Sequence, residues 1–134
     1  MKTGEHDDPI KKFNINDRLK SFRNAYSGLV ALLKFEHNAR IHLFILVVVV
    51  VAGIVIRISA IDWIAIFFAV GLVFASECFN TAIEYLSDIA FPEYNEKIKM
   101  VKDIGAAGVL ISAIVSVIIG IIIFLPKIYN LINA

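Results

Sequence analysis

Long apolar segments dominate the chain after residue 40. They contain few polar side chains, and they lack the alternation of apolar and polar residues that half-buried strands show. A helix needs about 20 residues to cross the hydrocarbon of a bilayer, and each segment approaches that length when its flanks are included. The sequence therefore predicts an all-α integral membrane protein. The expected spans cover about residues 38–57, 61–91 and 98–125, the last of them ending before Pro126.

A shorter stretch before these segments also has helical periodicity. Its apolar side chains recur at spacings of three and four residues, and its basic side chains fall largely elsewhere around the helix. Asp17 stands at an N-cap position. We predict an amphipathic helix over residues 17–35 on the membrane surface; packing against protein explains the pattern equally well, and both can hold. The polar residues 1–16 are expected to form a flexible cytoplasmic tail, which leaves residues 17–134 as one domain.

Composition agrees with a membrane protein, and the charge distribution orients it. Hydrophobic residues make up 59% of the chain, above the roughly 45–50% of soluble domains. Eight of the 13 Lys and Arg residues lie at or before Arg40, and Lys97, Lys99 and Lys102 lie in the second predicted loop. The positive-inside rule then places the N-terminus and this loop in the cytoplasm and the C-terminus outside. The net charge of +1 gives no indication of a nucleic-acid partner.

The third apolar segment carries small residues at four-residue spacing, a pattern that favours close packing of helices. They are Gly108, Ser112, Ser116 and Gly120. Because three helices of one chain enclose little interior, we expect a homo-oligomer. The single cysteine excludes an intrachain disulfide and a cysteine metal cluster.

A stripe of polar side chains lies towards the end of the second segment. Its members fall within roughly 80° of one another around a helix of about 3.6 residues per turn. A charge at the bilayer centre costs about 2.5–3.5 kcal/mol on insertion scales, so such a stripe indicates a function. The apolar part before it covers about 24 Å at a rise of about 1.5 Å per residue, which puts the first carboxylate near the cytoplasmic boundary of the hydrocarbon. The stripe consists of Glu77, Asn80, Glu84 and Asp88.

Further charged residues are expected at the same membrane face. Glu36 precedes the first segment, and Lys102 and Asp103 precede the third. Carboxylates gathered this closely need a counter-charge, for which a divalent cation with oxygen ligands is suited. A small cation-coupled transporter and an enzyme acting on a lipid headgroup both fit this arrangement. The transporter is disfavoured because the charges gather at one face, and no P-loop, protein-kinase glycine loop or HExxH motif points to a soluble enzyme.

Several motifs occur in a fixed order along the chain. The central one is Glu77-x-x-Asn80-Thr81-Ala82-Ile83-Glu84-x-x-x-Asp88, which is followed by Pro92-Glu93-Tyr94 and by Lys102-Asp103. Upstream lie Ser21-Phe22-x-x-Ala25-x-x-Gly28-Leu29 and Glu36-x-Asn38-x-Arg40-Ile41-His42. Together they resemble the prokaryotic diacylglycerol kinase family over about residues 18–126.

This resemblance implies a function, an assembly and a location. The implied protein is a homotrimer of three-span subunits in the bacterial cytoplasmic (inner) membrane. It would use Mg²⁺ and transfer the γ-phosphoryl group of ATP to diacylglycerol, giving phosphatidic acid. The upstream pattern from Glu36 to His42 looks more like members outside the diacylglycerol-specific branch. Some of those phosphorylate undecaprenol, which is the alternative substrate.

The resemblance also implies roles for individual residues. Glu77 matches the general base, Glu36 and Glu84 match the metal ligands, and Asn80 and Asp88 match positions that shape the site. The matching ATP-binding positions are Glu36, Glu84, Glu93, Tyr94, Asn95, Lys102 and Asp103. Asn95 stands where some members have a histidine, which weakens that contact. We interpret His37 and His42 as interfacial or packing residues.

Overall fold

The computed structural model describes residues 14–133, all within or next to four helices. These are α1 (Ile15–Phe35), α2 (His37–Ile56), α3 (Ala60–Ala90) and α4 (Glu96–Ile132). Within residues 14–133 no strand occurs, and the prediction of an all-α chain is confirmed. Helices α2, α3 and α4 are each long and apolar enough to cross a membrane.

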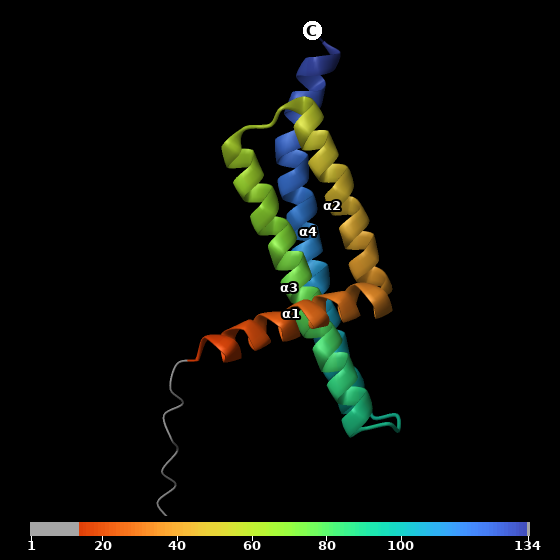
Figure 1. Cartoon of the computed structure of the whole chain (residues 1–134). Coiled ribbons are helices and arrows are strands. Elements are labelled where there is room, and N and C mark those ends of the chain that lie inside the picture. Colours follow the sequence, from red (N-terminus) through yellow and green to blue (C-terminus); the bar gives the residue numbers. More distant parts are fainter. Residues whose placement is uncertain (1–13, 134) are drawn as a thin grey trace, which may run out of the picture.

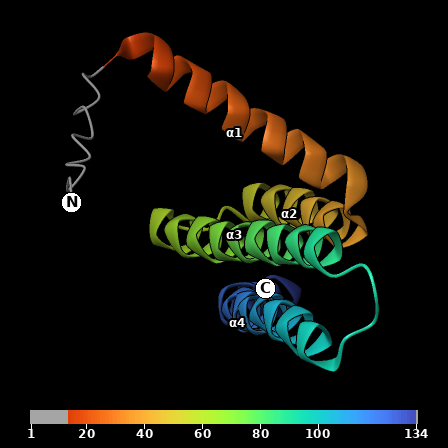
Figure 2. The ribbon, with the colours of Figure 1, turned by 90° about the horizontal axis from the view of Figure 1, so that it is seen from below.

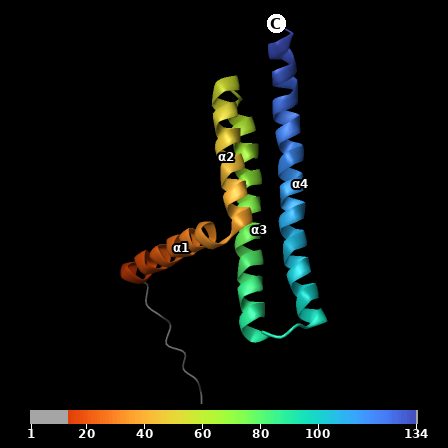
Figure 3. The same cartoon turned by 90° about the vertical axis from the view of Figure 1, so that its right-hand side faces the viewer.

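The three long helices lie side by side, and α1 runs across them (Figures 1 and 3). Helix α3 packs along α4 and also contacts α2, while α1 contacts both α2 and α3. Seen from below, α1 leads away from the bundle (Figure 2). The lower parts of α3 and α4 continue past the level of α1 (Figure 1). We call this lower end, with its Phe91–Asn95 loop, the α3–α4 end; the opposite end, with the Arg57–Ser59 turn, is the α2–α3 end.

Helix α1 begins at Ile15, earlier than the sequence indicated. Its N-cap is Asn14, whose side-chain oxygen accepts a hydrogen bond of 3.0 Å from the Asn16 backbone N–H. Asp17, which we expected to be the cap, instead lies in the first turn, where its charge complements the helix dipole. Of the predicted tail, residues 1–13 lie outside the described residues.

A capping box and a close helix contact form the α2–α3 end. Ser59 caps α3 by accepting a 3.2 Å hydrogen bond from the Asp62 backbone N–H, and the Asp62 carboxylate accepts one of 3.0 Å from the Ser59 backbone N–H. Trp63 packs over Gly53 of α2 so closely that a Cβ there would lie 2.8 Å from the indole ring. Glycine therefore permits the approach of α2 to α3 at this end.

The end of α4 departs from the prediction. We expected the last span to stop before Pro126, but the helix continues through this proline to Ile132. Proline removes one backbone hydrogen bond, a loss that apolar membrane helices tolerate. The following residue, Lys127, places its Nζ 3.1 Å from Asp62 of α3, and this ion pair joins the start of the extension to α3.

Little of each long helix is buried within the chain. A small core lies towards the α2–α3 end, where Ile58, Ile66 and Ile123 meet. Most large apolar side chains of α2, α3 and α4 face outward instead. Exposed apolar surface on this scale needs lipid or another protein to cover it.

Candidate active site

Glu77 is the most deeply buried charged side chain in the described part of the chain, with 2% of its surface exposed. Across the α2–α3 contact, His42 Nε2 lies 3.3 Å from Glu77 Oε1. The two atoms are close but not aligned as a hydrogen bond, so Oε1 has no hydrogen-bond partner among residues 14–133. Glu36 and Glu84 lie near enough for their charges to act on Glu77. A carboxylate in this position is costly unless a ligand or proton satisfies it.

Asn80 lies about one helical turn after Glu77 on α3, where α3 packs against α4. Its Nδ2 donates a hydrogen bond of 2.9 Å to Glu84 Oε1, one helical turn further on. Its Oδ1 lies against Gly105 of α4, where a Cβ would approach to 2.7 Å. Asn80 Oδ1 and the hydroxyl of Thr81 are both buried without a hydrogen-bond partner in the described range. Buried polar atoms of this kind are rare and call for an explanation, such as an absent ligand or water.

A polar cavity of about 610 Å³ opens at the α3–α4 end. Lys102 and Asp88 meet within it, with Nζ donating to Oδ1 over 2.7 Å. Its walls include most of the residues that the sequence assigned to ATP. The predicted site residues that line it are Glu84, Asp88, Glu93, Tyr94, Asn95, Lys102 and Asp103.

Besides Glu84, Asp88 and Lys102, two more of these residues have partners within the chain. The Asn95 side-chain oxygen caps α4 by accepting hydrogen bonds from the backbone N–H groups of Lys97 and Ile98, at 2.9 and 3.4 Å. Asp103 forms an ion pair with Lys99 on the same helix. Glu93 and Tyr94 are exposed on the loop. The positive charge facing the cavity therefore comes chiefly from Lys102 and Lys99.

Glu36 lies apart from the polar cavity, between α1 and α2, where it ends one helix and begins the next. Among residues 14–133 no three His, Cys, Asp or Glu side chains are grouped as a ready-made metal site. Magnesium, however, is commonly held by one or two carboxylates together with substrate phosphates. The carboxylates of Glu84 and Glu36 are therefore donors of the right kind, with the remaining ligands left to a nucleotide.

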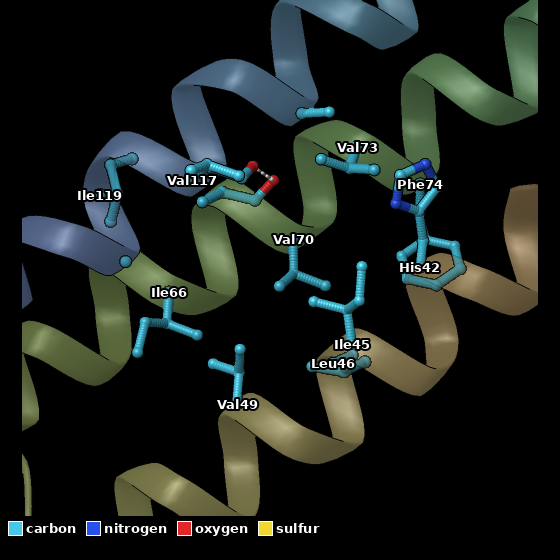
Figure 4. Close-up of a pocket in the computed structure, with 14 residues that line it drawn as sticks. His42, Ile45, Leu46, Val49, Ile66, Val70, Val73, Phe74, Val117 and Ile119 are labelled. Carbon is cyan, nitrogen blue, oxygen red and sulfur yellow. Dashed lines mark hydrogen bonds between the residues drawn. The ribbon is translucent and has the colours of Figure 1, made fainter. Parts of the chain in front are cut away.

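An apolar groove of about 220 Å³ lies between α2, α3 and α4 (Figure 4), and its lining on α3 ends at Phe74, three residues before Glu77. His42 lines one end of it, beside Phe74. Aliphatic side chains of all three helices form the rest of its wall. On α4, Ser116 approaches α3 closely enough to donate a 3.2 Å hydrogen bond to the Ala69 carbonyl. Part of the small-residue pattern on α4 thus serves packing within the chain.

Sequence reasoning missed two residues of this site. His42 was interpreted as a packing residue, and its position opposite Glu77 depends on how α2 docks on α3. Gly105 carried no signal of its own, because only the packing of α4 against Asn80 shows why a side chain is excluded there. The one available hint was that His42 closes the upstream motif that begins at Glu36.

Comparison with known proteins identifies the family. A family model described as prokaryotic diacylglycerol kinase matches residues 23–124. The chain belongs to this family. It is 33% identical over 127 residues to an undecaprenol kinase of Bacillus subtilis, an alignment that covers 95% of this chain and 99% of that one. It is also 35% identical over 114 residues to a diacylglycerol kinase of Synechocystis, covering 84% of this chain and 65% of that protein.

Membership confirms the resemblance seen in the motifs. The chain is a lipid kinase of the diacylglycerol kinase type, which favours the enzyme over the cation-coupled transporter. The matched segment runs from within α1 to near the end of α4, so it includes Glu77, the polar cavity and the apolar groove.

Proposed function

We propose that this lipid kinase transfers the γ-phosphoryl group of ATP to the terminal hydroxyl of undecaprenol, with diacylglycerol as the second candidate substrate. One observation carries the proposal: the buried carboxylate of Glu77 has an unpartnered oxygen, and along α3 it lies after the residues that line the apolar groove and before those that line the polar cavity. Such a position suits a group that must meet a lipid hydroxyl on one side and a nucleotide on the other.

The nucleotide is assigned to the polar cavity at the α3–α4 end. Lys102 and Lys99 supply positive charge for phosphate oxygens, and the loop residues Glu93 and Tyr94 lie at its rim. Glu84 and Glu36 would hold Mg²⁺, which supplies charge neutralisation on the transferring phosphoryl group when bound. Positioning and charge stabilisation account for most of the catalysis of phosphoryl transfer. This small set of residues contains the types of side chain that these two tasks need.

The lipid is assigned to the apolar groove, with its hydroxyl next to Glu77. Glu77 accepts the proton of the hydroxyl as the lipid oxygen forms its bond to the γ-phosphorus. The bond between that phosphorus and the β–γ bridging oxygen breaks, and ADP leaves. General-base catalysis requires the base within hydrogen-bond reach of the proton it takes, and His42, which lines the groove, lies 3.3 Å from Glu77.

The same proposal includes a membrane orientation and an assembly. The excess of basic residues in these regions supports an orientation with the N-terminus and the α3–α4 end in the cytoplasm and the C-terminus outside, and the membrane would be a bacterial inner membrane. Helix α1 then lies on the cytoplasmic surface, which its crossing direction in Figure 1 supports. The outward-facing apolar side chains fit a homotrimer in which neighbouring subunits and lipid cover them.

The preference for undecaprenol rests on the extent of similarity. The relative named undecaprenol kinase aligns over 99% of its length, whereas the one named diacylglycerol kinase aligns over 65%. The order of the two substrates is thus the reverse of the one that the family resemblance implied, and it agrees with the upstream motif from Glu36 to His42.

A direct assay tests the function and the substrate together. Purified protein in detergent micelles receives Mg²⁺, γ-labelled ATP and either undecaprenol or diacylglycerol. We expect labelled lipid with both substrates and a higher kcat/KM with undecaprenol. Faster phosphorylation of diacylglycerol would reverse the substrate assignment, and no labelled lipid from well-folded protein would overturn the kinase function.

A further inference from the structure

His42 occupies the point where the apolar groove meets Glu77. Its imidazole lines the groove (Figure 4), and its Nε2 lies 3.3 Å from Glu77 Oε1. The His42 side chain is 20% exposed and that of Glu77 only 2% exposed. The imidazole therefore lies on the more open side of the carboxylate, next to the space assigned to the lipid.

Glu77 needs a neighbour that fixes its orientation. A general base must direct one oxygen at the proton that it accepts, within about 2.6–3.2 Å between heavy atoms. The other interactions around Glu77 do not provide this, because Glu36 and Glu84 carry like charge. Asn80, the nearest amide along the stripe, directs its N–H at Glu84. His42 is thus the donor that the described residues place within reach of Glu77.

We propose that His42 is a positioning residue for the kinase reaction. Its Nε2–H donates to Oε1 of Glu77 when the substrates are bound, and this hydrogen bond directs Oε2 at the lipid hydroxyl. The small realignment required moves only side chains that already lie 3.3 Å apart. The proton of the hydroxyl goes to Glu77, and His42 keeps its own. The inference rests on the proposed function, because it takes Glu77 as the base.

Amide variants separate this role from simple packing. The side-chain amide of Gln reaches about as far as the imidazole Nε2, whereas that of Asn reaches only as far as Nδ1. His42→Gln therefore keeps a donor for Glu77, and His42→Asn and His42→Leu remove it. His37 offers a matched control, because it is exposed and lies one residue beyond Glu36 at the start of α2.

The experiment measures kcat and KM for ATP and lipid in full-length variants in detergent, with melting temperature as a check on folding. We expect His42→Leu and His42→Asn to lower kcat roughly tenfold to a hundredfold with little change in either KM, the size of effect that misplacing a catalytic group produces. His42→Gln and His37→Gln should keep most of the wild-type kcat. In a Glu77→Gln background, His42→Leu should cause no further loss, because the group that it positions is gone.

Several results would overturn the proposal. Unchanged kcat in His42→Leu would show that the imidazole only packs, and equal losses in His42→Gln and His42→Leu would exclude its role as a hydrogen-bond donor. Losses that multiply in the double variant would show that His42 acts independently of Glu77. Wild-type protein without kinase activity would instead refute the proposed function, so the two failures are distinguishable.

Discussion

The two ends of the helical bundle use their polar side chains in opposite ways. At the α2–α3 end, Ser59 and Asp62 satisfy each other's backbone groups, and Lys127 pairs with Asp62. Towards the α3–α4 end, buried oxygens of Glu77, Asn80 and Thr81 have no hydrogen-bond partner within residues 14–133. Polar groups at the first end hold helices together, whereas those at the second are available to a ligand. This contrast supports the proposed position of the site independently of any relative.

Metal removal should give the largest effect. If Glu84 and Glu36 hold Mg²⁺ with the nucleotide, EDTA should reduce lipid phosphorylation to the background of the assay, because the phosphate charge is no longer neutralised. The measurement is labelled lipid formed before and after chelation, with recovery on adding excess Mg²⁺. Circular dichroism in EDTA serves as the control for folding. Full activity in EDTA would contradict the metal assignment.

A methyl group at Gly105 of α4 should disturb the candidate site by displacing Asn80. The added Cβ would lie 2.7 Å from Asn80 Oδ1, so Asn80 must move and its hydrogen bond to Glu84 is disturbed. We expect Gly105→Ala to lower kcat by roughly tenfold to a hundredfold and to destabilise the fold by about 1–3 kcal/mol. Kinase assays and thermal unfolding in detergent measure the two effects.

Gly71→Ala is the matched control for this variant. Gly71 lies on α3, and a Cβ there would meet nothing within 4 Å. The control should keep wild-type kcat and stability. Equal behaviour of the two alanine variants would show that the contact between Asn80 and Gly105 has no importance for the site.

Loss of one charge in the polar cavity should have a smaller effect. Lys102→Gln removes a cation that lies beside Asp88 and faces the space assigned to phosphates. We expect KM for ATP to rise about tenfold, the size of one lost charge-assisted hydrogen bond, with KM for lipid unchanged. Steady-state kinetics check this, and Lys97→Gln, outside the cavity lining, is the control. A rise in the KM for lipid alone would show that Lys102 contacts the lipid and not ATP, which would contradict its assignment.

The smallest effect on activity should come from the α2–α3 end. Asp62→Asn weakens the ion pair with Lys127 and the capping box of Ser59. We expect a slightly lower melting temperature and wild-type kinetics, measured in the same detergent. A large loss of kcat with normal folding would mean that this end takes part in the reaction, and the contrast between the ends would fail.

Local patterns predicted the helices well, and the limits of that prediction have physical causes. The three apolar segments identified α2, α3 and α4, because length and composition alone decide whether a helix can span a bilayer. The expected stop at Pro126 was wrong: the helix continues to Ile132, and its contact with α3 through Lys127 and Asp62 joins residues far apart in sequence. The expected cap at Asp17 was wrong because Asn14 offers an earlier one.

Some residues of the candidate site are placed by spacing along one helix, and others are placed by packing between helices. Helical spacing alone brought Glu77, Asn80 and Glu84 to one face of α3, and the polar cavity gathers most residues assigned to ATP by resemblance. The pairing of His42 with Glu77 and the contact of Asn80 with Gly105 both cross between helices. Neither could be predicted from spacing along one helix. The roles of the gathered residues stay predictions until activity is measured.

Glu77→Gln tests the central claim most directly. The variant keeps the size of the side chain but removes the base, so transfer of labelled γ-phosphate to lipid should fall by roughly a hundredfold to ten-thousandfold. Binding of a fluorescent ATP analogue and the melting temperature should stay close to wild type, because the polar cavity is intact. That pattern would place the chemistry at Glu77. Near-normal phosphate transfer by the folded variant would contradict the account.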